Sequence, residues 1–419
     1  MKVSIAFLLV FSVLSLRNGM DEPLVPFSAE LSLIGLFVAL VYVLIKRAAG
    51  GGVSVNSSQK IFILLLFALF FLALSSAFWS SYVAETIVRS FLFIGVPLLY
   101  LIIVLLDKPN PEEIIKYFVS FSVVMVCVGL FILSFGEVVY SGGAWINSYS
   151  LFGYSLSQPH YSNNFRLASL VGNSNLLGLY AGVSIGLCFW LAAISAIGRY
   201  KLFTYIAILI VGVLLSQSRA AIGFAFLSGA IGLFLMKGIT FMRLVVASAI
   251  SMIVFLGIAW YVASQQHLFD RFSAGVNDRD IAWGIISPRL SESAIWGHGF
   301  GSVTEFLAVE NGVSIGAHSL YYTLAYELGL IGCALFFVLV VMALFDKARR
   351  MCRADFIIFS LIILFLGHQI VEVQILKFNL VNIIFLYLCF TPVWQNAQKS
   401  YAGRLDRYQL IPASRSTDG

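Results

Sequence analysis

Long apolar runs, separated only by short polar breaks, recur along the whole chain and constrain its fold more than any other feature. A helix needs about 20 apolar residues to cross a bilayer, so a dozen crossings would use about 240 residues. The runs predict twelve spans, near residues 3–16, 29–45, 61–79, 87–106, 118–139, 176–197, 202–217, 220–236, 244–264, 319–345, 355–371 and 380–394. With 60% hydrophobic residues, the chain is too apolar for a soluble protein. We therefore expect an all-α integral membrane protein with about 12 transmembrane helices.

The expected organisation is one polytopic membrane domain over residues 1–395, followed by a basic tail over 396–419. The first run, to Leu16, resembles a signal peptide but lacks a small-residue cleavage site before Arg17, so we expect a retained first span. A large loop is expected at about 265–318, between the ninth and tenth spans. Within it, IAWGIISP and TEFLAVE predict short helices. A second long polar segment covers about 140–175.

The basic residues predict the orientation of the spans. One set of alternate loops, together with both ends of the chain, holds 18 of the 26 lysines and arginines. Cytoplasmic loops carry the excess of such residues, so this set and both termini are predicted to be cytoplasmic. The eight others are expected on the outer side: Arg17, Arg89, Arg166, Arg219, Arg271, Arg279, Arg289 and Lys377. Topology thus explains most of the net charge of +6, and no nucleic-acid partner is predicted.

Ser216–Gln217–Ser218–Arg219 interrupts two apolar runs on the predicted outer side. This arrangement places Arg219 at the amino end of a helix, where unpaired N–H groups and the helix dipole attract an anion. An arginine fork adds bidentate geometry for phosphate. The alternative is an arginine that extends to the lipid head groups. Arg219 is predicted to bind an anion, with Gln217 beside it as a substrate-binding residue.

His318 begins the tenth run, at the same predicted membrane edge. A helix amino end disfavours the imidazolium, so the neutral ring could accept a proton. The alternative is an interfacial hydrogen-bonding residue. Arg279, Arg289 and Arg166 are further cation candidates in the outer segments. Glu327 lies deeper in the run, where a carboxylate is either functional or braces a neighbouring helix.

Neither a metal nor a cofactor is predicted. The five cysteines contain no CxxC pair, the five histidines show no ligand spacing, and the pair Asp278 and Asp280 is a pattern common by chance. GHGFG at 297–301 lacks the context of a dinucleotide fingerprint and predicts a tight turn. A transporter would place charges at mid-span. Here the charges gather at one membrane edge, which favours chemistry at the interface.

Five segments carry a resemblance to a known family: NFRLASLVGNSNLLGLY (164–180), SQSRAAIG (216–223), RDIAW (279–283), WGHGFGS (296–302) and AHSLYYTLAYELGLIG (317–332). In their order and outer placement they resemble the O-antigen ligase and O-antigen polymerase superfamily of bacterial membrane glycosyltransferases. The resemblance covers roughly residues 60–395, and any one segment alone would be weak.

The resemblance implies metal-independent, inverting glycosyl transfer at the periplasmic face of the bacterial inner membrane. The donor would be a glycan on undecaprenyl pyrophosphate, and membrane lipid would surround the site. The acceptor would be a hydroxyl of lipid A-core in a ligase, which we expect, or another lipid-linked repeat unit in an O-antigen or exopolysaccharide polymerase. A lipid-glycan transporter is the non-enzymatic alternative. Arg219 and His318 would match the family's essential arginine and histidine, and Arg279, with Arg289 as second choice, its loop arginine. Arg166 is a further substrate-binding candidate.

Overall fold

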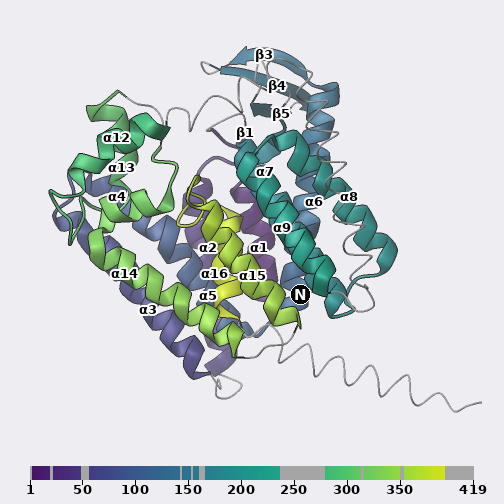
Figure 1. Cartoon of the computed structure of the whole chain (residues 1–419), viewed down its shortest axis with the longest axis horizontal. Coiled ribbons are helices and arrows are strands. Elements are labelled where there is room, and N and C mark those ends of the chain that lie inside the picture. The colour runs from purple at the N-terminus through teal and green to yellow at the C-terminus, as the bar shows by residue number, and fades with distance from the viewer. Residues whose placement is uncertain are drawn as a thin grey trace, which may run out of the picture.

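Figure 1 shows the computed structural model of the chain, in which long helices pack side by side. The structure describes residues 2–18, 22–48, 56–141, 144–151, 154–159, 166–235, 279–312, 316–349 and 353–391. The predicted ninth span at 244–264 and the tail 396–419 lie outside these residues.

The apolar runs form helices throughout the described residues. In chain order these are α1 (Val3–Leu14), α2 (Ser28–Ala48), α3 (Ser57–Ser75), α4 (Val83–Ser90), which continues through a π-helical turn into α5 (Val96–Asp107), α6 (Pro111–Phe135), α7 (Ser174–Ala193), α8 (Arg199–Ser216), α9 (Arg219–Leu235), α14 (Leu320–Ala348), α15 (Arg353–His368) and α16 (Leu380–Phe390). Seven helical segments are long and apolar enough to cross a membrane, and α1, α9, α15 and α16 are shorter apolar helices. The chain is a multi-pass membrane protein, and these eleven segments coincide with eleven predicted spans.

Helix α7 lies at the centre of one half of the bundle, against α6, α8, α9 and α15 (Figure 1). Its glycines at four-residue spacing allow the close approach. A Cβ at Gly178 would lie 2.5 Å from the Ser216 hydroxyl, and one at Gly186 would lie 2.5 Å from the Leu361 side chain. Small residues at this spacing let helices pack closely in a membrane, where no water drives them together. The packing fixes the amino end of α7, which carries part of the site described below.

The segment after α6 departs from the all-α expectation. It forms an antiparallel sheet of β3 (Glu137–Ser141), β4 (Ala144–Leu151) and β5 (Tyr154–Pro159), with Val139 opposite Ile146 and Ser148 opposite Ser157. Aromatic and β-branched residues alternate with serines here, a pattern suited to a strand with one solvated face. The polar composition led us to expect only a loop. The sheet defines what we call the upper end of the molecule (top of Figure 1).

A minor two-stranded pair, β1 (Arg17–Asn18) and β2 (Glu22–Pro23), joins α1 to α2. Gln158 of β5 fastens the larger sheet to the bundle. Its side-chain amide donates to the Gly129 carbonyl of α6 (3.1 Å), and its side-chain oxygen accepts from the Ser169 N–H (2.7 Å). Gln158 is fully buried, so these bonds satisfy polar atoms that have no access to water.

The described part of the large predicted loop contains helical segments, as expected from its two amphipathic patterns. It contains α12 (Arg279–Arg289), α13 (Ser302–Glu305) and a π-helical turn (Phe306–Glu310). The predicted tight turn at GHGFG is confirmed, because Gly297, Gly299 and Gly301 all have positive φ. The turn also has a partner that the sequence did not suggest. Helix α14 is interrupted at Gly329 (φ 60°, ψ −160°), and the backbone of 294–299 pairs with the freed groups.

That pairing is a short ladder of main-chain hydrogen bonds. His298 N–H donates to the Tyr326 carbonyl (2.8 Å), Gly299 N–H to the Glu327 carbonyl (2.9 Å), and Leu330 N–H to the Ala294 carbonyl (2.8 Å). The Glu327 carboxylate itself accepts from the Val303 N–H (3.4 Å) in α13. The sequence left two alternatives for Glu327, a functional carboxylate or a brace for a neighbouring helix. Its contact with α13 is that of a brace.

Candidate active site

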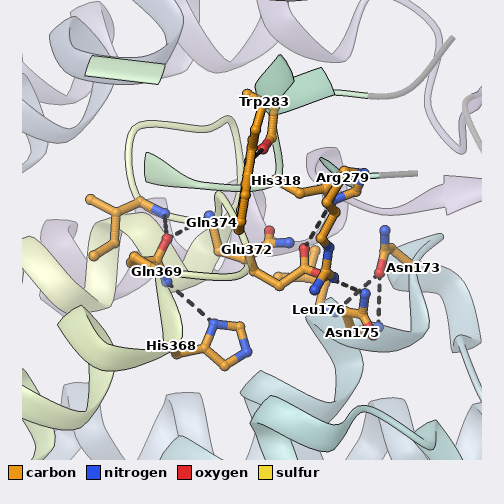
Figure 2. A network of polar contacts seen from close by, with 12 residues as sticks. Asn173, Asn175, Leu176, Arg279, Trp283, His318, His368, Gln369, Glu372 and Gln374 are labelled. Carbon is orange, nitrogen blue, oxygen red and sulfur yellow. Dashed lines mark hydrogen bonds and ion pairs between the residues drawn. The ribbon is translucent and has the colours of Figure 1, made fainter. Parts of the chain in front are cut away.

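Glu372 is the centre of a polar cluster at the upper end of the bundle (Figure 2). It lies in the segment that joins α15 to α16, and its side chain is only 4% exposed. Arg279 Nη2 donates to Glu372 Oε1 (2.7 Å), and Asn175 Nδ2 donates to the same oxygen (2.5 Å). His318 Nδ1 lies 3.6 Å from Glu372 Oε2. Four segments far apart in the sequence thus meet at one buried carboxylate.

Helix α12 places Arg279 at its first position, where the side chain extends to Glu372. Trp283, one turn further along α12, fixes the helix. Its indole N–H donates to the Ala317 carbonyl (2.7 Å), and its ring stacks on Tyr322 at 5.2 Å between centroids. The indole therefore ties α12 to the residue just before His318.

His318 lies two residues before α14 and has a left-handed backbone (φ 47°). Such a conformation costs free energy for a residue other than glycine, and it persists only where the surroundings impose it. Here the chain is anchored on both sides of His318. Before it, the Ala317 carbonyl accepts from Trp283, and after it, the Leu320 N–H donates to the Gln369 carbonyl (2.9 Å). The imidazole is 28% exposed, so its ring is open to a ligand from one side.

Gln369 holds the segment that carries Glu372. Its side-chain oxygen accepts from the N–H groups of Gln374 (2.7 Å) and Ile375 (3.0 Å), so the chain from α15 folds into a compact turn. Its carbonyl also accepts from the start of α14, as described above. One buried glutamine therefore fixes the spacing between His318 and Glu372 (Figure 2).

Arg166 joins the cluster through Asn175. Arg166 Nη2 donates to Asn175 Oδ1 (3.0 Å), while Arg166 Nε donates to the Ser216 carbonyl at the end of α8 (3.2 Å). Asn175 stands in the first turn of α7, which Asn173 caps by accepting from the Asn175 N–H (2.8 Å). The amide of Asn175 thus bridges a cation and the central carboxylate.

The electrostatics of Glu372 follow from these neighbours. Burial alone would raise the pKa of its carboxyl, but the hydrogen bond and charge of His318 and the charge of Arg279 outweigh burial and lower the pKa below its ordinary value. Glu372 is therefore ionised at neutral pH. Arg279 and Arg166 carry two positive charges and Glu372 one negative charge, so these three side chains have one net positive charge, which suits an anionic ligand.

The predicted site residues lie in three places. His318, Arg279 and Arg166 belong to the Glu372 cluster. Arg219 begins α9, at the amino end of a helix as predicted, and is exposed. Only Gln217 and Ser218 separate it from α8, whose Ser216 carbonyl accepts from Arg166. Gln217 ends α8 with a left-handed backbone (φ 51°), which turns the chain sharply into α9.

Arg289 lies elsewhere. It ends α12, ten residues and roughly 15 Å of helix rise beyond Arg279. Its guanidinium pairs with Glu292 (2.8 Å) and lies over the Phe306 ring at 5.6 Å, with both charged side chains nearly half exposed. The sequence analysis named Arg279 and Arg289 as candidates for the loop arginine. Of the two, Arg279 lies at the Glu372 carboxylate that His318 also faces.

Sequence reasoning did not select Glu372 or Asn175 as site residues. Glu372 was visible as an acidic residue within the apolar stretch HQIVEVQIL, and carboxylates in such a setting are costly unless they have a function or a partner. Asn175 had no such signal, because asparagine at the start of a helix is usual. Among the described residues, no three His, Cys, Asp or Glu side chains gather in a way that could hold a metal ion.

Comparison with known proteins does not place the chain in a family. No protein-family model matches it, and no curated protein matches it either.

Proposed function

We propose that this chain is a glycosyltransferase similar to the O-antigen ligases. In this proposal it lies in the bacterial inner membrane with both termini in the cytoplasm, in the twelve-span layout expected from the sequence. It transfers a glycan from undecaprenyl pyrophosphate to a hydroxyl of lipid A-core at the periplasmic face. The observation that carries the proposal is the meeting of His318 and Arg279 at Glu372. A proton acceptor and a cation for phosphate thereby share one partly open site.

The roles of the residues follow from the geometry. Glu372 faces Nδ1 of His318, so it favours the tautomer with the proton on Nδ1 and leaves Nε2 free to accept one. The acceptor hydroxyl attacks the anomeric carbon from the side opposite the pyrophosphate, and His318 takes the hydroxyl proton. General base catalysis of this kind contributes about 10²–10⁴-fold.

The bond between the anomeric carbon and the pyrophosphate oxygen breaks with its electron pair, and undecaprenyl pyrophosphate leaves with inversion at carbon. Arg279, with Arg219 at the start of α9, stabilises the negative charge that grows on the leaving group. A lipid pyrophosphate is a competent leaving group on its own, so the step needs no metal. Glu372 acts through its neighbours and is a positioning residue.

The test is the lipopolysaccharide ladder of the source organism after deletion of the gene. Complementation uses the wild type, His318→Ala, and the control His298→Gln, which changes a histidine of the GHGFG turn outside the Glu372 cluster. We expect loss of every O-antigen band, with polymer accumulating on undecaprenyl pyrophosphate, and rescue by the wild type and the control but not by His318→Ala.

Other outcomes assign the protein differently. Lipid A-core that carries a single repeat unit would identify a polymerase. A polymerase would use the same site at Glu372. An unchanged ladder would exclude O-antigen as the glycan. Full rescue by a well-inserted His318→Ala protein would overturn the catalytic assignment.

A further inference from the structure

A cavity of about 450 Å³ opens at the upper end of the bundle, next to the Glu372 cluster. We call it the basic cavity. Four parts of the chain line it: the residues around Arg17 after α1, Phe93 in the π-helical turn between α4 and α5, the amino end of α7 at Asn173, and the segment 373–379 that follows Glu372. None of the functional roles proposed above uses it.

The charges that face the basic cavity have one sign. Arg17 and Lys377 both line it, and its described lining contains no aspartate or glutamate. The amino end of α7, which carries the positive end of the helix dipole, faces the same space through Gly172 and Asn173. Two cations and a helix amino end around one cavity favour an anion, and most strongly a phosphate.

Lys377 shows the electrostatic consequence of this arrangement. Its ammonium lies 5.6 Å from the centre of the Phe93 ring. Burial lowers the pKa of Lys377, and the nearby charge of Arg89 lowers it further, while the charge of Glu327 acts in the opposite direction. An anion in the basic cavity would relieve this cost, because it would stabilise the charged form of the lysine.

A second cavity, of about 340 Å³, continues from the first. Arg17, Phe93 and Phe378 line both. The second cavity extends along the start of α2, where Phe27 and Leu92 line it and Glu30 is its one acidic residue among those described. Beyond it, α2 has strongly exposed apolar side chains, including Phe37 (65%) and Val38 (60%), as expected for a surface in contact with lipid tails. A cationic cavity thus adjoins a second, mostly apolar cavity on the side of α2.

We propose that the basic cavity is a second anion-binding site, which binds the phosphate head group of a membrane lipid through Arg17 and Lys377. The lipid chain follows the second cavity along α2. The proposal does not depend on the transferase activity, because it concerns binding at residues outside the Glu372 cluster. If the transferase assignment also holds, the site adjoins the Glu372 cluster at Val373 and would keep one of the lipid substrates beside the reaction.

The experiment measures lipid binding to the full-length protein, purified in detergent, by native mass spectrometry. The probes are undecaprenyl pyrophosphate, dioleoyl phosphatidylglycerol and dioleoyl phosphatidylcholine. Arg17→Gln and Lys377→Gln are compared with the matched controls Arg199→Gln and Lys60→Gln, which remove exposed cations elsewhere. We expect each cavity variant to weaken binding of an anionic lipid about tenfold or more, and each control to leave it unchanged.

The three lipids separate the possible sources of the phosphate. An effect of the variants on undecaprenyl pyrophosphate alone would identify a substrate lipid, and an effect on phosphatidylglycerol would identify a lipid of the bilayer. Both results support the site. Equal binding of phosphatidylcholine and the anionic lipids, or wild-type affinity in both cavity variants, would overturn it.

A second measurement uses the wild-type protein and so does not depend on the folding of a variant. A photoreactive phosphatidylglycerol with its reactive group in the head should crosslink to residues 171–176 and 373–379. Crosslinks confined to segments outside the lining of the two cavities would overturn the proposal. A loss of glycan transfer without a change in these crosslinks would contradict only the proposed function.

Discussion

Glu372 carries one negative charge that three donors share, and its removal changes each of them. In Glu372→Gln the pairing with Arg279 and the orientation of His318 weaken together, although the shape of the side chain is kept. We expect glycan transfer to fall about 100-fold, because a base that loses its orienting carboxylate has the wrong tautomer in part of the population. Transfer is measured with purified protein and lipid-linked donor over a range of pH.

The control for this variant is Glu292→Gln, which removes a carboxylate paired with an arginine on the exposed end of α12. It should transfer glycan at the wild-type rate. A purely structural role for Glu372 would lower the amount of folded protein but leave the pH profile of the remaining activity unchanged. That unchanged profile would contradict the positioning role.

The lowered pKa of Glu372 also predicts how stability depends on pH. A carboxylate whose pKa is lower in the folded state than its ordinary value of 4.5 stabilises the fold fully above that value, and the contribution is lost as pH falls through the folded pKa. The thermal midpoint of the wild type should therefore exceed that of Glu372→Gln at pH 6 and 7, with the difference shrinking below about pH 4.5. A difference that stays constant down to pH 3 would contradict the assignment of the charged form.

At the scale of the elements, the break in α14 at Gly329 fixes the turn that precedes the site. A Cβ at this position would lie 2.4 Å from the Ile295 carbonyl oxygen, and the positive φ is unfavourable for any side chain. We expect Gly329→Ala to lower the free energy of unfolding by at least about 2 kcal/mol, from strain and the lost ladder to 294–299. Thermal unfolding in detergent measures the change.

Gly284 offers a matched control in α12. A Cβ there would meet nothing within 4 Å, and the residue is helical. Gly284→Ala should be neutral or stabilise the protein by up to about 1 kcal/mol, because alanine loses less backbone entropy than glycine in a helix. Equal destabilisation by both substitutions would show that the break in α14 has no special role.

The elements also show how far the sequence could predict this fold and site. Apolar runs and polar breaks located the helices, because hydropathy is a local property, and the amphipathic pattern located α12. The sheet β3–β5 was missed because its serine-rich alternation resembles a polar loop. Glu372 was missed as a site residue because its importance arises only when α7, α12 and the start of α14 meet there. Such contacts depend on long-range packing, which no local pattern contains.

At the scale of the whole molecule, four of the cations predicted on the outer side gather with His318 at the upper end of the bundle. Arg17, Arg166, Arg279, His318 and Lys377 line the basic cavity or belong to the Glu372 cluster. These arginines and this lysine are exceptions to the excess of basic residues in the predicted cytoplasmic loops. A cation at the disfavoured edge of a membrane is costly, and the anionic lipid proposed above would offset part of that cost.

The same distribution predicts which end of the bundle faces the cytoplasm. Ser291 lies exposed just after α12, at the upper end, and Tyr200 lies exposed at the start of α8, beside two basic residues. In a cysteine-free background, a membrane-impermeant thiol reagent applied to intact spheroplasts should label Ser291→Cys but not Tyr200→Cys, and disruption of the membrane should expose both. Because the fold is held fixed by its packing, these two positions decide the orientation of the whole site. The reverse labelling would put His318 and Arg279 on the cytoplasmic side, where a periplasmic transfer reaction cannot take place.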